Sequence, residues 1–308
     1  MNVVVTGASS FVGINIIRKL LDNYLDIAIY GIVRPNSPNN QKLDEFRNRI
    51  KIIEIDMSDI NLLTNYLEKI DVIYLNAWRG TRGSSRLDES IQKQSYIDSI
   101  NAAKVAIELG ANTIIGIGSQ AEYGIVYDEV DENHETNPIT AYGKYKLMTY
   151  NKLKEMCINN IDLKWGRIFS AYGVGDYENT LIMQCVNKMI TSDTIELSKC
   201  TQMWNYINII DVANIFSLML KKCIPSGIYN ISSNDTRVLK DYVLEIKKLT
   251  KSNSILNFGT VQKDEKLMNL LPINNKIMRL LKNYDFISFE EGINLIISCN
   301  EKYSKKGD

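Results

Sequence analysis

Thr6-Gly-Ala-Ser-Ser-Phe-Val-Gly13 decides the fold, because it joins an apolar run (residues 2–6, NVVVT) to a helical pattern over residues 11–22. Gly7 permits a tight turn after the strand, and Gly13 allows the helix to pack closely on it. The first N–H groups of such a helix lie at its positive dipole end and bind a pyrophosphate. This context therefore predicts a dinucleotide-binding site. Its expected contacts are Gly7, Ser9, Ser10, Phe11, Val12 and Gly13.

The first half of the chain alternates apolar runs with helical patterns. The runs occupy residues 2–6, 27–33, 50–55, 71–76 and 113–118, and the longest helical stretch covers residues 90–110. The runs are continuously apolar rather than alternating, which is typical of a parallel sheet buried on both faces. We therefore predict an α/β fold, a Rossmann-type doubly wound parallel sheet.

The pattern loosens after Tyr172. Helices are expected at residues 179–191, 211–222 and 240–249, and short strands at 206–210 and 229–231. We expect an NADP-binding Rossmann lobe of residues 1–170 and 205–222. Residues 171–204 and 223–308 are expected to form a smaller, interleaved substrate-binding lobe, with a frayed tail from residue 302.

The composition excludes several classes of partner. Lys and Arg together number 36, as do Asp and Glu, so no charge footprint for nucleic acid or an anionic membrane exists. No apolar run reaches the length of a bilayer span, and a strand starting at residue 1 leaves no room for a signal peptide, so we expect a cytoplasmic protein. The five cysteines form no CxxC and have no nearby histidine, so we expect reduced, semi-buried packing residues and no metal.

The residues at the end of the second predicted strand are expected to determine whether NAD or NADP binds. An acidic residue there would bind the ribose 2′-hydroxyl, but the sequence reads Arg34-Pro-Asn-Ser37. Arg34 and Ser37 therefore favour NADP(H) over NAD(H), unless Arg34 is only a solvated loop charge. Asp56, with Met57, follows the third strand and is expected either to hold the adenine edge or to cap the next helix.

Tyr142 and Lys146 are four residues apart, which places them on one face of a helix. A free phenol titrates near pH 10, but a fixed ammonium group beside it stabilises the phenolate and suits it to proton transfer. Ser119 ends the strand at residues 113–118, where its hydroxyl is expected to bond a substrate oxygen beside the phenol. Ser119, Tyr142 and Lys146 are therefore the predicted catalytic residues.

These features together resemble the extended short-chain dehydrogenase/reductase family, in its nucleotide-sugar epimerase/dehydratase branch. The matching stretches are TGASSFVG, Asp56-Met57, LNAW (residues 75–78), GSQAEYG (118–124), Tyr142 with Lys146, GRIFSAYG (166–173) and WNYINIIDVA (204–213). The resemblance implies that Tyr142 is the acid/base, that Lys146 tunes it and binds the nicotinamide ribose, and that Ser119 orients the substrate oxygen. It also implies cofactor contacts from Asn76 and Ala77, and a homodimer formed through the helix that carries Tyr142.

The residues after Ser119 narrow the reaction. Dehydratases of this branch carry an Asp-Glu pair there, whereas this chain has Gln120-Ala121. The loop has no cysteine, and His134 lies in an acidic loop, so 3,5-epimerisation is not supported either. The leading hypothesis is an NADPH-dependent reductase of a nucleotide-linked 4-keto-6-deoxyhexose that supplies a deoxysugar for a surface glycan. The alternatives are an NAD-dependent nucleotide-sugar 4-epimerase and, in another class, a non-catalytic dinucleotide-binding regulator.

A nucleotide sugar is the expected substrate, and arginines are the expected contacts of its diphosphate. Arg79, Arg82 and Arg86 cluster after the fourth strand and are candidates for this contact, unless they only form a solvated basic loop. Many relatives carry Arg-Asp-Tyr-Ile where this chain has Trp204-Asn-Tyr-Ile207, which leaves Arg237 as a substitute. Trp204 is expected to stack on the substrate or to pack in the core. The predicted substrate-binding residues are Trp78, Arg79, Gln120, Glu122, Asn179, Trp204 and Arg237.

Overall fold

The structure is a computed structural model that describes residues 1–157, 161–261, 268–282 and 284–304. It divides into two compact units. The first contains residues 1–124, 134–168 and 212–231, and the second contains residues 125–133, 169–211 and 232–308. Within the described residues, no helix is both long and apolar enough to cross a membrane.

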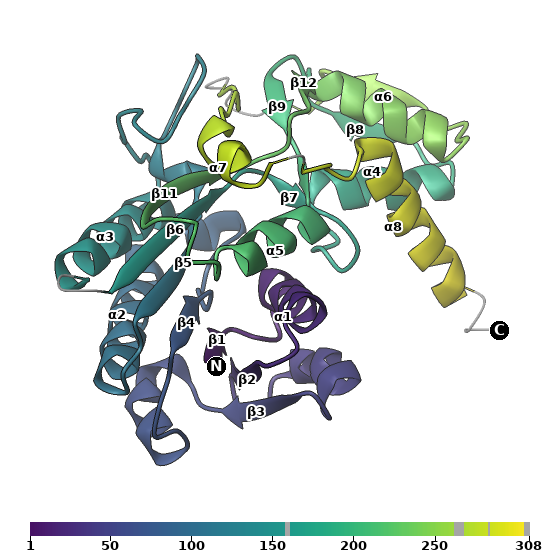
Figure 1. The fold of residues 1–308 in the computed structure, drawn as a ribbon. Coiled ribbons are helices and arrows are strands. Elements are labelled where there is room, and N and C mark those ends of the chain that lie inside the picture. The colour runs from purple at the N-terminus through teal and green to yellow at the C-terminus, as the bar shows by residue number, and fades with distance from the viewer. Residues whose placement is uncertain (158–160, 262–267, 283, 305–308) are drawn as a thin grey trace. The chain divides into compact units, whose positions relative to one another are not determined.

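A seven-stranded parallel sheet forms the centre of the first unit (Figure 1). Its order is β11-β6-β5-β4-β1-β2-β3. The strands are β1 (Asn2–Thr6), β2 (Ala28–Val33), β3 (Ile50–Glu54), β4 (Val72–Leu75), β5 (Thr113–Ser119), β6 (Asp162–Ile168) and β11 (Gly227–Ile231). The strand order reverses at β1, so the predicted Rossmann-type doubly wound fold is confirmed.

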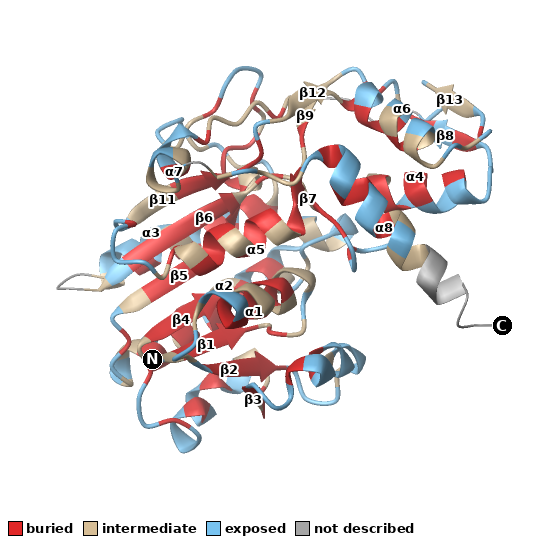
Figure 2. Ribbon diagram, turned by 45° about the vertical axis from the view of Figure 1, so that its right-hand side comes forward, coloured by how far each residue is buried: buried red, intermediate tan, exposed pale blue. Residues whose placement is uncertain are grey.

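Helices cover both faces of this sheet. α2 (Glu89–Glu108) and α3 (Ala141–Met156) lie on one face, and α1 (Phe11–Asn23) and α5 (Ile209–Leu218) lie on the other (Figure 1). Short 3-10 helices occupy four connections: η1 (Pro38–Phe46), η2 (Met57–Asn65), η3 (Gly83–Leu87) and η4 (Gln120–Glu122). The strands are mostly buried (Figure 2), which explains why most of their residues are apolar. Charged exceptions include the exposed Lys51 and Glu54 in β3 and the buried Lys164 and Arg167 in β6.

Among the residues of the second unit that the structure describes, two-stranded ladders combine with helices. β7 (Ala171–Tyr172) pairs with β10 (Ile207–Asn208), β9 (Met203–Asn205) with β12 (Thr236–Val238), and β8 (Ile195–Leu197) with β13 (Leu256–Phe258). The helices are α4 (Leu181–Ile190), α6 (Leu239–Leu249), α7 (Asn275–Leu280) and α8 (Phe289–Ser304). A cluster of buried apolar side chains from α4, α6 and α8 forms its core.

Three expectations about the arrangement of the chain need correction. β11 was expected in the substrate lobe, but it is an edge strand of the main sheet and belongs to the first unit. Residues 125–133 were expected in the Rossmann lobe but join the second unit, where Val130 pairs with Pro272. The tail was expected to fray from residue 302, but α8 continues to Ser304, and residues 305–308 lie outside the described residues.

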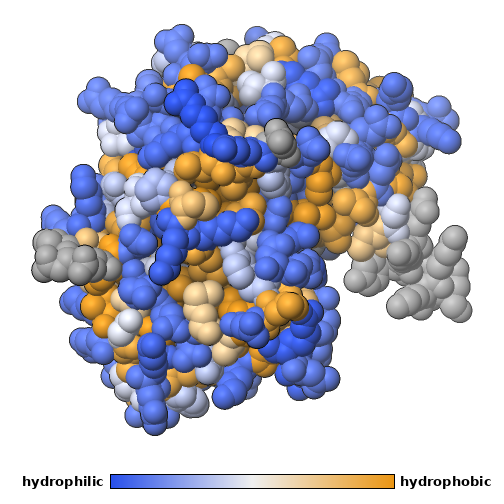
Figure 3. Space-filling model, in the orientation of Figure 1, coloured by the Kyte–Doolittle hydropathy of each residue, from blue (hydrophilic) through white to orange (hydrophobic). Residues whose placement is uncertain are grey.

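The surface is largely hydrophilic, and the cysteines differ in how far they are buried. Hydrophilic residues cover most of the face drawn in Figure 3, with smaller hydrophobic patches between them. All five cysteines are free. Cys185 and Cys200 are buried, whereas Cys223 is exposed, contrary to the expectation of semi-buried packing.

Candidate active site

The glycine turn after β1 is too tight for side chains. Gly7 has φ +63°, and a Cβ there would lie 2.9 Å from Cα of Ala77, at the end of β4. A Cβ at Gly13 would lie 2.4 Å from the carbonyl oxygen of Gly7. Both glycines are therefore required for the turn to approach β4 and for α1 to pack against it.

Polar side chains hold this turn in place. Ser10 caps α1, since its hydroxyl accepts from the N–H of Gly13 at 3.1 Å. The side-chain amide of Asn76 donates to the carbonyl of Gly7 at 2.9 Å and to Ser10 Oγ at 2.9 Å. Ser10 thus acts as the helix cap, and Asn76 braces the turn.

The turn has the features that a pyrophosphate requires. It follows β1 at the point where the strand order reverses, which is where doubly wound sheets bind ligands. Ser10 takes the N–H of Gly13, and within the described residues no backbone acceptor is found for the N–H groups of Phe11 and Val12. These residues fit the phosphates of a dinucleotide.

The loop after β2 lies beside this turn. Ser9 Oγ donates to Asn40 Oδ1 at 3.2 Å, and Asn40 Nδ2 donates to the carbonyl of Arg34 at 3.0 Å. Arg34 is exposed, and no ion pair is found for it within the described residues. Ser37 is half-buried at the start of η1. Asn40, which the sequence did not single out, therefore connects the glycine turn to the loop expected to select the cofactor.

Asp56 and Arg79 form an ion pair at the ends of β3 and β4. Asp56 also caps η2 by accepting from the N–H of Ser58, as one of its two expected roles predicts. Partial burial raises the pKa of Asp56, but hydrogen bonds from Ser58 and the charge of Arg79 lower it overall. Arg79 was expected to bind the substrate diphosphate, and the structure instead places it with the predicted adenine residues Asp56 and Met57.

Ser119 lies at the junction of β5 and η4. Its hydroxyl accepts from the N–H of Ala121 at 3.2 Å, and its own N–H donates to the carboxylate of Glu122 at 2.8 Å. The two side chains form a capping box, which fixes the backbone that carries Ser119. Ser119 is buried, with 8% of its surface exposed.

Glu122 is a structural residue. Its side chain is completely buried, and its carboxylate accepts from Arg167 Nε at 2.7 Å and from Trp165 Nε1 at 3.0 Å. The expectation that Glu122 binds a sugar hydroxyl is therefore wrong, because the carboxylate is enclosed by internal partners. Gln120 remains half-buried beside Ser119 and accepts from its hydroxyl at 3.4 Å.

α3 brings Tyr142 and Lys146 to the end of β5. Thr140 caps this helix by accepting from the N–H of Gly143 at 3.1 Å. Both predicted catalytic side chains face inward, with Tyr142 8% and Lys146 3% exposed. Lys146 Nζ donates to the carbonyl of Ile117 in β5 at 2.7 Å, which ties the helix to the strand.

The environment of these two residues shifts both protonation equilibria. Burial raises the pKa of Tyr142, while the charge of Arg86 and a side-chain hydrogen bond with Ser119 oppose that rise. Burial lowers the pKa of Lys146 to about 7, against the charge of Glu122. Ser119, Tyr142 and Lys146 thus meet at one place in the first unit, in an arrangement suited to proton transfer.

Trp78 lies against the same two residues. Its ring is T-shaped to that of Tyr142 with centroids 6.2 Å apart, and Lys146 Nζ lies 3.9 Å from its centroid. Trp78 Nε1 donates to Gln92 Oε1 at 2.7 Å. Trp78, expected as a substrate contact, is therefore part of the wall around the proton-transfer residues.

The remaining predicted substrate residues belong to the second unit. Asn179 is exposed just before α4 and donates to the hydroxyl of Tyr177 at 2.9 Å. Trp204 lies opposite Arg237 in the β9–β12 ladder and packs against the apolar cluster of this unit. The structure thus supports the core-packing alternative for Trp204.

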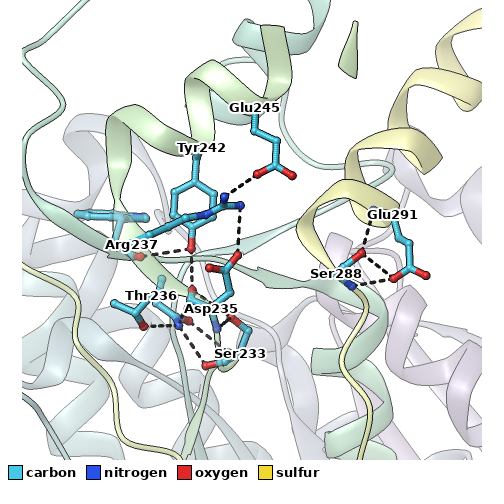
Figure 4. A network of polar contacts seen from close by, with 10 residues as sticks. Ser233, Asp235, Thr236, Arg237, Tyr242, Glu245, Ser288 and Glu291 are labelled. Atoms are coloured by element: carbon cyan, nitrogen blue, oxygen red, sulfur yellow. Dashed lines mark hydrogen bonds and ion pairs between the residues drawn. The ribbon is translucent and has the colours of Figure 1, made fainter. Parts of the chain in front are cut away.

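The guanidinium of Arg237 is engaged by two carboxylates (Figure 4). Nη1 lies 2.6 Å from Glu245 and Nη2 lies 3.2 Å from Asp235, and the group stacks 4.2 Å from the ring centroid of Tyr242. Arg237 was expected to replace the diphosphate contact of the relatives. The structure corrects this expectation, because both terminal nitrogens of the guanidinium already lie beside carboxylates.

A cavity of about 440 Å³ also lies in the second unit. Aromatic side chains line it together with acidic and polar groups, among them Tyr172, Tyr206, Asp235, Asp285 and Phe286. Ser119, Tyr142 and Lys146 are not among its lining residues. The proton-transfer residues are therefore not part of this cavity.

Residues 3–232 match the model of the NAD dependent epimerase/dehydratase family. The chain belongs to this family. It is an enzyme of the short-chain dehydrogenase/reductase type, rather than the non-catalytic regulator considered from the sequence.

Individual members show how far the likeness extends. An uncharacterized protein of Methanocaldococcus jannaschii is 25% identical and aligns over 95% of this chain and 94% of its own. Among solved structures, a UDP-N-acetylglucosamine 4-epimerase of Methanobrevibacter ruminantium has a TM-score of 0.87 at 18% identity, covering 98% of both chains. A UDP-glucuronic acid 4-epimerase of Bacillus cereus, solved with NAD, has a TM-score of 0.83 at 20% identity, covering 100% of this chain and 99% of that one. At these identities the solved structures establish the fold.

Two residues of this family member's site escaped the sequence analysis. Gln92 is fully buried and ties the loop after β4 to α2, but a lone glutamine in a helix gives no signal of this. Arg167 lies in the stretch GRIFSAYG that carried the family resemblance, yet it received no role. Arg167 stands in a strand of the central sheet, and a charged residue buried there requires a partner, which is the signal that could have found it.

Proposed function

We propose that this protein is a nucleotide-sugar 4-epimerase that uses a bound nicotinamide dinucleotide. The observation that carries the proposal is the meeting of Ser119, Tyr142 and Lys146 in one unit with the glycine turn. Gln120 and Ala121 occupy the positions at which dehydratases of this branch carry their acid and base. Proton transfer at a single carbinol is the chemistry that these side chains support.

Each residue has a definite task in this proposal. Tyr142 takes the proton of the sugar 4-hydroxyl and returns it to the ketone oxygen after the ketosugar has turned its other face toward the cofactor position. Ser119 donates a hydrogen bond to the same oxygen. Lys146 stabilises the phenolate of Tyr142. A bound nicotinamide would supply the redox chemistry, as acceptor of the C4 hydride from one face of the sugar and donor of it to the opposite face.

The proposal reverses the preference for a reductase that the sequence favoured. The resemblance to 4-keto-6-deoxyhexose reductases has no counterpart among the relatives reported above. Those relatives with an assigned activity are named as 4-epimerases. We therefore place the epimerase first and retain the nucleotide sugar as the substrate class.

Equilibration of epimers tests this function. The protein is incubated with NAD⁺ and, separately, with UDP-, dTDP-, GDP- and CDP-hexoses, and products are separated by chromatography. We expect one pair of 4-epimers to reach the same ratio from either side, with no net change in reduced-nicotinamide absorbance. Tyr142→Phe is expected to abolish the conversion, and an unchanged rate in this variant would refute the assignment of Tyr142.

One observation favours a second candidate, an NADPH-dependent ketosugar reductase. β2 ends without an acidic residue, and the exposed Arg34 follows it beside Ser37. In this candidate Arg34→Ala weakens NADPH binding by at least about tenfold and leaves NADH binding unchanged. Equal effects on both cofactors would leave Arg34 as a solvated loop charge.

The expected homodimer is likewise a proposal, which the molar mass in solution tests.

A further inference from the structure

The loop between β4 and α2 (residues 76–88) is held in one conformation by Gln92. The Gln92 amide donates to the carbonyls of Gly80 and Ser85, each at 2.8 Å, while its oxygen accepts from Trp78. A Cβ at Gly80 would lie 2.6 Å from Gln92 Nε2, so the loop fits closely around this amide. Gln92 therefore ties the loop to α2 at Trp78, Gly80 and Ser85, the last of which directly precedes Arg86.

Arg86 is carried by this loop onto the face of Tyr142. Its guanidinium carbon lies 4.5 Å from the centroid of the Tyr142 ring, within the range of a cation–π contact. Trp78 meets the same ring edge-on. Within the described residues, Arg86 has no carboxylate or carbonyl partner. Its charge therefore faces the phenol without a protein anion to neutralise it.

Three other charged groups act on Tyr142, and none of them supplies a positive charge as strong and constant as that of Arg86. Lys146 Nζ lies 5.9 Å from the ring centroid, and because burial lowers the pKa of Lys146 to about 7, it carries only part of a charge at neutral pH. Glu122 contributes an opposing negative charge, and Arg82 a weaker positive one. An arginine keeps its charge at every physiological pH.

We propose that Arg86 is a positioning residue whose permanent charge stabilises the phenolate form of Tyr142 and so sets its affinity for the proton. A phenolate has a more electron-rich ring than a phenol, so a cation over the ring favours the ionised form. This inference rests on the proposed function only in assigning proton transfer to Tyr142. It adds a residue outside the predicted catalytic set, placed by the clamp of Gln92.

The test is a titration of Tyr142 that requires no substrate. The chain is labelled with 3-fluorotyrosine, whose fluorine acidifies the phenol, and its fluorine resonances are followed with pH. The resonance of Tyr142 is the one missing from Tyr142→Phe among those of the 17 tyrosines. Arg86→Met is expected to raise the titration midpoint of Tyr142 by about 1 pH unit or more, because it removes an opposite charge at short range.

Matched variants show whether the shift of the midpoint comes from the charge of Arg86 or from a change in the structure of the loop. Arg82→Met removes the same charge from the same loop and is expected to move the midpoint by less than half the shift in Arg86→Met. Arg86→Lys keeps a cation and is expected to stay closer to wild type than Arg86→Met. An unchanged midpoint in Arg86→Met, or equal shifts in the Arg86 and Arg82 variants, would overturn the proposal. If Arg86→Met does not fold, as judged by thermal melting, Arg86→Gln carries the same prediction.

The same variants distinguish this proposal from a role in substrate binding. Once a substrate is known, Arg86→Met is expected to shift the kinetic pKa in the same direction as the titration midpoint. A rise in KM without any shift in either pKa would make Arg86 a substrate anchor and contradict the inference. Because the titration is independent of turnover, absence of epimerisation refutes the proposed function and leaves this inference standing or falling on its own.

Discussion

Gly143 in α3 and Ala121 in η4 lie so close that a Cβ on Gly143 would be 2.2 Å from the carbonyl oxygen of Ala121. The helix that carries Tyr142 therefore rests directly on the backbone that follows Ser119. Gly143 takes no part in proton transfer, but its lack of a side chain sets the distance between Ser119 and Tyr142, which do.

Gly143→Ala is expected to lower turnover by about tenfold or more, because the added methyl pushes α3 away from η4 and displaces the phenol from the substrate oxygen. Turnover of the wild type and the variant, with circular dichroism to check the fold, tests this. Lys144→Ala changes an exposed neighbour in the same turn and is expected to retain wild-type turnover. Full activity in Gly143→Ala would mean that the close contact does not position Tyr142.

Removal of Glu122 is expected to destabilise the protein strongly. Glu122→Ala leaves the buried guanidinium of Arg167 without its anion, and breaking such a pair costs about 3–5 kcal/mol. Urea unfolding measures the loss. Lys152→Ala breaks an exposed pair with Glu155 and is expected to change the free energy of unfolding by less than about 1 kcal/mol. Similar losses in both variants would contradict the structural role of Glu122.

Lys146 makes stability depend on pH in a predictable direction. Burial lowers its pKa in the folded chain to about 7 from the usual 10.5. Between these values the unfolded chain holds a proton that the folded chain has lost, so this residue makes the free energy of unfolding rise with pH. Below about pH 7 both states are protonated, and the full cost of the buried charge remains.

Lys146→Met removes this cost, so its stability advantage over the wild type is expected to be largest below about pH 7 and to shrink toward about pH 10. Each pKa unit corresponds to about 1.4 kcal/mol, and loss of the hydrogen bond to Ile117 works against the gain. Urea unfolding of both proteins across this pH range gives the difference. A difference that does not vary with pH would show that Lys146 keeps its ordinary pKa.

The sequence predicted those parts of the fold whose pattern is local. The continuous apolar runs marked β1 to β5 to within about two residues, because a strand buried on both faces is apolar along its whole length. The strand at Tyr229 was also predicted, but it was assigned to the wrong lobe. A short apolar run does not reveal which sheet it joins, and β11 pairs with a strand some sixty residues earlier.

Site residues could be predicted where they belong to a sequence motif. They could not be predicted where their role depends on a partner far away in the sequence. Ser119, Tyr142 and Lys146 follow from spacing and residue type. Glu122 was taken for a substrate contact because it follows Ser119, whereas its partner Arg167 lies 45 residues further on. The closeness of Gly143 to Ala121 is likewise a tertiary contact that the sequence pattern does not record.

The fate of the hydrogen on the reacting carbon tests the central claim most directly. A nucleotide sugar carrying deuterium at C4 is converted by the protein with NAD⁺ in ordinary water, and the product epimer is examined by mass spectrometry and NMR. Hydride removal to a retained cofactor and its return predict that the deuterium stays at C4 throughout. Loss of deuterium to solvent, or consumption of NADPH in step with a reduced product, would contradict the account.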